Sequence, residues 1–256
     1  MANTVYANKV IEARAKDLLT TKINTRNLMT VDNELAQEAG MTKTVNTYTY
    51  TGTAEEVGAG EGNSARGSIA YVGTDYTVKM VQQVFDYQDE DFLKDPTIVD
   101  NGVAGATQTM TNKMTADFAA EAKKASLTVA KGADGLSYDN IVDAISEINV
   151  EDESKLFVVI PNEWKADLRK DPDYVAARMG EVVYNGQVGT VAGLPVIASK
   201  AFTEAYVMSP EAITLFIKKD VEVEQDRDKD TRTNSIYLRS AYLVALTDAT
   251  KICSIK

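Results

Sequence analysis

The residues best able to do chemistry in this sequence are its clustered carboxylates. Two neighbouring carboxyl groups can act as general acid and base when burial or a like charge raises one pKa. Nothing in the neighbouring sequence indicates such burial, because each cluster lies in a polar segment. We therefore interpret the clusters as solvated loops. They are Glu55-Glu56, Asp89 to Asp91, Glu151 to Glu153 and Asp226 to Asp230.

Two segments superficially resemble ligand-binding loops. From Asp226 onward acidic residues alternate as in an EF-hand, but that calcium loop needs glycine sixth and glutamate twelfth, where Thr231 and Tyr237 stand. The glycine-rich run from Gly58 to Asn63 is not followed by the lysine of a phosphate-binding loop, and its Glu61 would oppose phosphate. The sequence therefore predicts neither a metal site nor a cofactor.

The absence of histidine and the presence of a single cysteine argue against catalysis. The chain has no histidine, which removes the commonest general base and metal ligand. Its single cysteine, Cys253, can form neither an intrachain disulfide nor a thiolate cluster. In the apolar setting of residues 251–255 we expect it to be a buried strand residue. We predict that the protein is not an enzyme.

Charge and hydropathy limit the partners of the 256-residue chain. The formal net charge of −11 would repel nucleic-acid phosphates, so sequence-specific DNA binding is not expected. No apolar run approaches the roughly 20 residues that span a bilayer, which predicts no membrane partner. The N-terminal residues lack the apolar centre of a signal peptide, so we expect the protein to be made in the cytoplasm.

The first third of the chain predicts a helix followed by a long hairpin. Residues 5–21 have the apolar spacing of an amphipathic helix. Residues 43–51 are β-branched and aromatic, the glycine-rich residues 53–67 predict a mobile tip, and β-prone runs return at 68–72 and 76–85. Such a two-stranded arm is marginal alone in water. It either lies on its own domain or is completed by another subunit, and we favour the second arrangement.

The remainder predicts an α+β fold. Apolar residues three or four apart from Ile98 to Ala125 predict a helix of roughly 40 Å. The run Lys131 to Gly135 marks a break between lobes. Further helices are expected at 138–148, capped by Ser137, and at 163–170 and 174–183. Strands are expected at 156–160, 188–199, 206–208, 213–217, 221–225, 235–246 and 251–255.

Three local motifs point to a known family. They are Val158 to Trp164 (VVIPNEW), Gly189 to Val196 (GTVAGLPV), and Glu222 to Asp228 with Arg239 to Tyr242 and Thr247 to Ala249. With this order of elements, the sequence resembles the major capsid proteins of tailed bacteriophages, which have the Hong Kong 97 capsid fold. The resemblance implies an N-terminal arm with helix (1–41), an extended loop with adjoining strand (42–84), a peripheral domain with a spine helix (85–135), an axial domain (136–221) and closing strands that return to the peripheral domain (222–256).

The resemblance also implies a function. The chain would be a major capsid protein whose copies form hexamers and pentamers of an icosahedral shell around double-stranded DNA, bound without sequence specificity. It would assemble in the host cytoplasm with a portal and a separate scaffolding protein, since no long charged helical segment precedes the arm. No lysine lies between Thr44 and Val78, so loop-mediated cross-linking through lysine is not expected.

Contacts between subunits are expected at the extended loop and at residues 226–232. We expect the sparse apolar residues of the loop to be buried on a neighbour, and Glu55, Glu56 and Arg66 to pair with a neighbour's charges, for which residues 226–232 are the candidate. The alternatives are an encapsulin-type shell, a carboxylate- or lysine-dependent soluble enzyme, and a phage tail or decoration protein. The expected subunit-contact residues are Tyr48, Tyr50, Glu55, Glu56, Arg66, Ile69, Tyr71, Asp226, Arg227, Asp228 and Arg232.

Overall fold

The computed structural model describes residues 7–21, 25–37, 39–132, 135–177 and 189–256. Its helices are α1 (Asn8–Thr21), α2 (Asp89–Lys94), α3 (Ile98–Ala122), α4 (Tyr138–Ile148), α5 (Lys165–Lys170) and α6 (Pro172–Ala177). Its strands are β1 (Thr30–Asp32), β2 (Thr42–Thr51), β3 (Ser68–Thr77), β4 (Lys79–Gln88), β5 (Leu127–Val129), β6 (Phe157–Pro161), β7 (Thr190–Val191), β8 (Leu194–Ser199), β9 (Ala205–Met208), β10 (Ile213–Asp228), β11 (Thr233–Leu246) and β12 (Ile252–Ile255).

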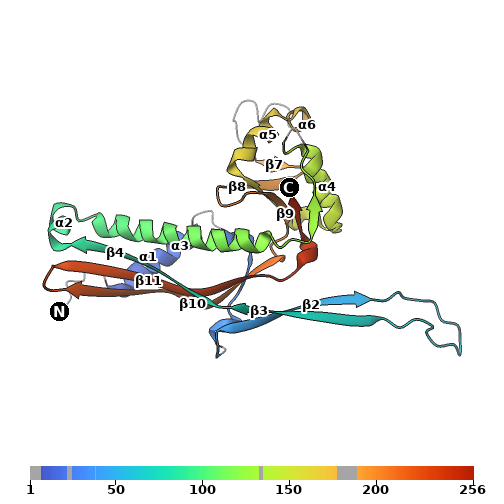
Figure 1. Cartoon of the computed structure of the whole chain (residues 1–256), viewed down its shortest axis with the longest axis horizontal. Coiled ribbons are helices and arrows are strands. Elements are labelled where there is room, and N and C mark those ends of the chain that lie inside the picture. Colours follow the sequence, from blue (N-terminus) through green and yellow to red (C-terminus); the bar gives the residue numbers. More distant parts are fainter. Residues whose placement is uncertain (1–6, 22–24, 38, 133–134, 178–188) are drawn as a thin grey trace.

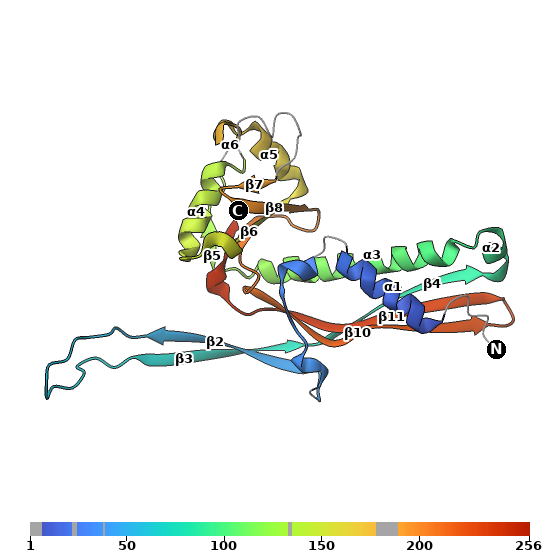
Figure 2. The same cartoon turned by 180° about the vertical axis from the view of Figure 1, so that it is seen from behind.

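The strands form three sheets. The first has the order β1-β10-β11-β4, the second β5-β12-β9-β6-β8-β7, and the third is the hairpin β2-β3. In Figure 1 the long helix α3 runs along the four-stranded sheet, the six-stranded sheet stands above one end of that helix, and the hairpin extends as an arm. The view from behind shows α1 beside β10 and α3 (Figure 2). The α+β class and the long hairpin are confirmed.

Helix α3 forms because one stripe of its surface is apolar. Val103, Met110 and Phe118 are at most 4% exposed, and they lie against the sheets as their spacing predicts. The 25 residues give a length of about 38 Å. Helix α1 contributes Ile11 and Ala15 to the same packing, and the Arg14 side chain makes an ion pair with Asp100 of α3. The four-stranded sheet is thus covered on one face by two helices.

Strand β11 changes character along its length. From Asn234 to Leu238 every second residue is buried, as expected where one face of a sheet is in solvent. From Ser240 to Ala245 every residue is buried. Here the root of the hairpin and the helical turn Glu34–Ala36 cover the second face, through a cluster that contains Val78, Leu35 and Leu243. The hairpin is therefore anchored on the body at its root alone.

The sequence predicted the strands at the end of the chain incompletely. The runs at 213–217 and 221–225 are a single strand, β10, whose register shifts between Ile217 and Glu222. The polar residues 218–220 interrupt the apolar pattern, but a β-bulge lets the strand continue past them. Strand β1, which pairs in parallel with β10, was not predicted because its three residues lie in a polar stretch without periodicity.

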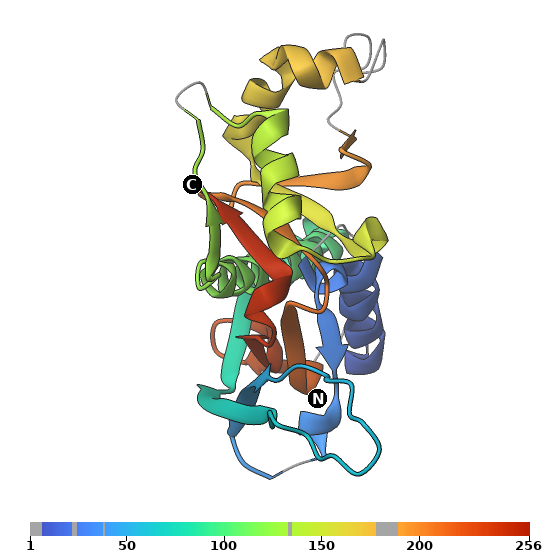
Figure 3. The ribbon, with the colours of Figure 1, turned by 90° about the vertical axis from the view of Figure 1, so that its right-hand side faces the viewer.

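The expected domain boundaries need correction. The boundary at Val221 falls within β10, which belongs to the four-stranded sheet from Ile213 onward. The prediction that residues 222–256 return as a whole to one lobe is wrong for β12, and β5 lies outside the lobe expected for 85–135. Both strands belong to the six-stranded sheet, in which β12 pairs in parallel with β5 and antiparallel with β9. Cys253 and Ile255 lie in one apolar cluster with Ile141 of α4. Figure 3 shows α4 beside β12.

The six-stranded lobe confirms several local predictions. Ser137 caps α4 by accepting a hydrogen bond from the Asn140 amide, and Asn140 bonds back to the Ser137 amide. Every residue of β6 is buried, as its continuous apolar run predicted. Burial raises the pKa of the Cys253 thiol to about 11, so Cys253 is the buried strand residue that was expected. The helix expected at 174–183 is α6 as far as Ala177, and its remainder lies outside the described residues.

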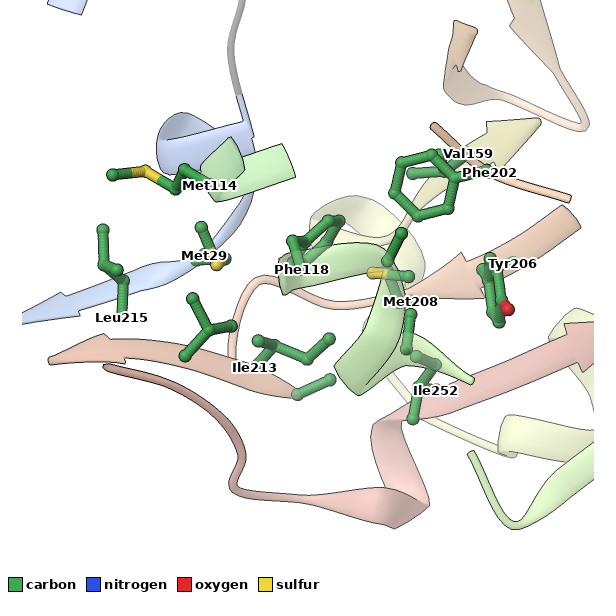
Figure 4. Close-up of a cluster of buried hydrophobic side chains, with 14 of the residues drawn as sticks. Met29, Met114, Phe118, Val159, Phe202, Tyr206, Met208, Ile213, Leu215 and Ile252 are labelled. Carbon is green, nitrogen blue, oxygen red and sulfur yellow. The ribbon is translucent and has the colours of Figure 1, made fainter. Parts of the chain in front are cut away.

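One apolar cluster joins the two larger sheets. It contains Phe118 of α3, Ile213 of β10, and Val159 and Met208 from the six-stranded sheet (Figure 4). Phe118 meets Phe202 edge to face with ring centroids 5.7 Å apart, and its exposed fraction is 0%. Because this packing belongs to both lobes, it fixes the angle between them.

The two glycines of α3 predict opposite effects of the same substitution. A Cβ at Gly102 would lie 2.3 Å from a ring carbon of Phe85 on β4, whereas one at Gly105 meets nothing within 4 Å. We expect Gly105→Ala to stabilise the fold by about 1 kcal/mol through helix propensity. Gly102→Ala should destabilise it by about 1–3 kcal/mol, because the Phe85 ring must move. Urea unfolding of both variants tests this, and equal effects would contradict the close packing of α3 on β4.

Candidate assembly surfaces

The hairpin β2-β3 has two chemically different faces. Directly paired residues share a face of an antiparallel sheet, and the register pairs Tyr48 with Tyr71 and Tyr50 with Ile69. We call these four residues the aromatic face. The opposite side, which we call the threonine face, contains Thr47, Thr49, Thr51, Ser68, Ala70 and Val72.

The aromatic face has no cover within the described part of the chain. Tyr48, Tyr50, Ile69 and Tyr71 are 64%, 69%, 68% and 70% exposed. The front and back views show that the hairpin points away from both lobes (Figures 1 and 2). The arrangement in which the arm lies on its own domain is therefore excluded for this structure.

Glycines fix the position of one aromatic ring. A Cβ at Gly67 would lie 2.2 Å from the Tyr50 hydroxyl oxygen, and one at Gly52 would lie 2.7 Å from it. The Tyr50 ring thus lies against bare backbone at the point where both strands end. Tyr48 and Tyr71 are also in contact, with ring centroids 6.3 Å apart. The face is consequently pre-organised in the single chain.

The tip of the hairpin is shaped by Glu55. Its carboxylate accepts hydrogen bonds from the Ser64 hydroxyl at 2.6 Å, from the Ser64 amide and from the Ala65 amide. The hydrogen bonds from Ser64 hold the pKa of Glu55 below its ordinary value. Glu55 therefore has partners inside the loop, which the sequence did not predict. Glu56 and Arg66 are exposed and form no ion pair among the described residues, so their pairing with a neighbour stays a prediction.

The turn at 226–232 lies at the opposite end of the molecule from the hairpin tip (Figure 1). Arg227 makes an ion pair with Asp89, and Arg232 makes one with Glu90 at 2.8 Å. Asn234 donates to Asp89 at 2.7 Å, and this bond together with the two arginines lowers the pKa of Asp89. Both arginines therefore hold the turn on α2 within one chain. Any pairing with the hairpin tip would have to occur between two copies.

Asp226 and Asp228 differ in their surroundings at this turn. Asp228 accepts from the Asp230 amide and the Thr231 hydroxyl, each at 2.9 Å, and these bonds lower its pKa. Asp226 accepts from the Arg227 amide at 2.8 Å. Asp228 thus stabilises the turn, and a role in subunit contact remains a prediction for both residues.

Comparison with solved structures identifies the fold. A Mycobacterium phage Che8 structure matches with TM-score 0.69 and 17% identity over 90% of this chain and 89% of that one. A capsid structure of the cyanophage P-SCSP1u matches with TM-score 0.69 and 10% identity, over 89% of this chain and 86% of that one. A virus-like particle from Pyrococcus furiosus matches with TM-score 0.67 and 11% identity, over 97% of this chain and 98% of that one. The chain has the Hong Kong 97 capsid fold. No protein-family model and no curated protein matches the sequence.

In the terms of this fold, β2-β3 is the extended loop and α3 the spine helix. Near the root of the loop, α3 meets β4 and β11 at a polar cluster around Asp117, which is 8% exposed. Its carboxylate accepts from Lys113 at 2.7 Å, from the Tyr242 hydroxyl at 3.0 Å and from Lys79 at 3.3 Å. Burial alone would raise the pKa of Asp117, but these donors lower it below its ordinary value. The cluster was not predicted, because its members are as much as 125 positions apart.

A small cleft lies beside this cluster. Its volume is about 200 Å³, and Tyr76 of β3, Glu121 of α3 and Lys79 of β4 are among its lining residues. The ammonium of Lys124 lies 5.1 Å from the centre of the Tyr76 ring. Burial and the Glu121 carboxylate raise the pKa of Tyr76. Polar contacts thus hold the root of the extended loop against the spine helix.

The charge of Asp117 predicts a pH-dependent stability. Asp117→Asn should cost about 1–3 kcal/mol near pH 7, because three donors then lose a charged acceptor. The depressed pKa makes this contribution complete above the ordinary carboxyl pKa of about 3.9, and it disappears as pH falls through the folded-state pKa. The stability difference between the two proteins should therefore shrink below about pH 4. Urea unfolding at a series of pH values measures it. A difference that stays constant down to pH 3 would contradict this account of Asp117.

A metal site and a membrane-spanning helix each have structural requirements that can be checked in the described residues. No group of three or more histidine, cysteine, aspartate or glutamate side chains among them is arranged to hold a metal ion. None of the helices in the described ranges is long and apolar enough to cross a membrane.

Proposed function

We propose that this chain is the major capsid protein of a tailed bacteriophage, which assembles through hexamers and pentamers into an icosahedral shell around double-stranded DNA. The observation that carries the proposal is the uncovered aromatic face on the extended loop of a capsid fold. A subunit that folds completely and still presents such a face is built to be covered by another molecule.

The lobes take on roles under this proposal. The four-stranded sheet with the spine helix is the peripheral domain, and the six-stranded sheet is the axial domain that meets other copies around the symmetry axes. The extended loop lies across a neighbouring subunit. The net charge of −11 suits the wall of a container whose packed DNA must not adhere to it. The chain acts by assembly and not as an enzyme, with a portal and a separate scaffolding protein as partners in the host cytoplasm.

The size of the particles formed by the purified chain tests the proposal. We expect light scattering and sedimentation to show a narrow population of closed, very large particles, either from the chain alone or after co-expression with the neighbouring genes. A monomer under every condition would contradict the proposal and favour a soluble enzyme. Tubes, rings or trimers would instead favour a tail or decoration protein.

An encapsulin-type shell that stores a cargo protein is the second candidate. It rests on the match to the virus-like particle from Pyrococcus furiosus, a shell that is compatible with either candidate and whose match covers 97% of this chain and 98% of that one. The contents of particles from the native source separate the two. Nuclease-resistant double-stranded DNA supports the phage capsid, and a single enclosed protein supports the storage shell.

A further inference from the structure

We propose that the aromatic face, and not the threonine face, is the side of the extended loop that contacts a second copy of this chain. The inference rests on the proposed function and specifies which surface of the loop makes the contact. It predicts that Tyr48, Tyr50, Ile69 and Tyr71 become buried on assembly, while Thr49 and Ala70 stay in solvent.

The size of the face argues for a permanent cover. Three tyrosines and one isoleucine that are about two-thirds exposed present roughly 500 Å² of surface, at 150–250 Å² for each aromatic side chain. That is a large patch for a single soluble chain, and more than half of what one partner contributes to a standard interface, about 800 Å². The threonine face carries hydroxyl groups and one large apolar residue, Val72, and has less to gain from burial.

The chemistry of the face selects a protein surface as the partner. Its four side chains are uncharged, and the nearest tip carries Glu55, Glu56 and Glu61 against one arginine, Arg66. A stacking platform for single-stranded nucleic acid needs cations along the backbone path, so this acidic tip excludes that ligand. Tyrosines that are already ordered lose little conformational entropy on contact, as expected for anchors of a protein interface.

The position of the face selects another copy of the chain. The hairpin is anchored at its root alone and points away from both lobes, so its own chain does not supply the cover (Figure 1). Every copy then offers one such face and receives one, which is a head-to-tail contact that closes into rings. That closure is what hexamers and pentamers require.

Thiol labelling distinguishes the two faces, because the native Cys253 is completely buried and has a raised pKa. Ile69→Cys places a thiol on the aromatic face, and Ala70→Cys places one on the opposite face one residue away. We expect maleimide to label both positions at similar rates in dissociated subunits. In assembled particles the rate at position 69 should fall at least tenfold, and the rate at position 70 less than threefold. Tyr71→Cys and Val72→Cys form a second pair with the same expectation.

The outcomes separate this inference from the proposed function. Particles in which position 70 is protected as strongly as position 69 would overturn the face assignment and leave the shell in place. Particles that never form from the unmodified chain would overturn both. An Ile69→Cys chain that folds without assembling, beside an Ala70→Cys chain that assembles, would support the assignment.

Discussion

Replacing three tyrosines of the extended loop, in the variant Tyr48→Ser/Tyr50→Ser/Tyr71→Ser, is expected to abolish shell assembly and leave the subunit folded. All three rings are exposed in the single chain, so their loss removes little packing from its core. In the assembly each ring would contribute about 1–2 kcal/mol as a buried anchor. A total of about 3–6 kcal/mol raises the concentration needed for assembly by roughly 100-fold to 10,000-fold.

The threonine face provides the matched control. Thr47→Ser/Thr49→Ser/Thr51→Ser changes the same number of positions on the same hairpin, and should assemble like the unmodified chain. Light scattering against protein concentration gives the threshold, and urea unfolding of the subunits checks the fold. Equal thresholds for the two triple variants would contradict the role of the aromatic face. An unfolded tyrosine variant would show that these rings stabilise the subunit itself, which their exposure argues against.

The substitution Phe118→Ala is expected to have the largest effect on the stability of the single chain, about 3–5 kcal/mol. Phe118 is 0% exposed and packs in the cluster shared by both lobes, against Phe202 and Met208 (Figure 4). The cavity left by the ring cannot be filled without moving one sheet relative to the other. Loss of this contact should also make the angle between the lobes variable, so assembly should fail even where the chain remains folded.

Two control variants sharpen this prediction. Phe118→Leu keeps most of the volume and should cost less than Phe118→Ala. Leu93→Ala removes an apolar side chain that is 82% exposed, and should change the free energy of unfolding by less than about 0.5 kcal/mol. Urea unfolding of the dissociated subunits measures all three. A cost below 1 kcal/mol for Phe118→Ala would show that the shared cluster does not hold the lobes together.

Features that depend on neighbouring residues were predictable from the sequence. The apolar stripe of α3, the cap at Ser137 and the continuous apolar run of β6 each arise from side chains within one element. The hairpin was equally evident, because its β-branched strands flank a glycine-rich tip. The exposure of Tyr48 and Tyr71 followed from how few large apolar residues the arm contains.

Features that depend on distant residues were not predictable. Asp117 accepts hydrogen bonds from Lys79 and Tyr242, which lie on strands far from it in the sequence. Strand β12 follows the four-stranded sheet in the chain but pairs in the other sheet, and only the pairing shows this. Glu55 has the same sequence signature as a solvated acid, yet it bonds to Ser64 across the tip. Local patterns contain no information on such partners.

The central claim is that copies of this chain form a closed shell in which each extended loop lies on a neighbour. An electron cryomicroscopy reconstruction of particles from the purified chain tests it most directly. We predict hexamers and pentamers in which the side chains of Tyr48, Tyr50, Ile69 and Tyr71 are buried in contact with the adjacent subunit. A closed shell whose loops make no contact with neighbours, or particles without rings of six and five subunits, would contradict the account.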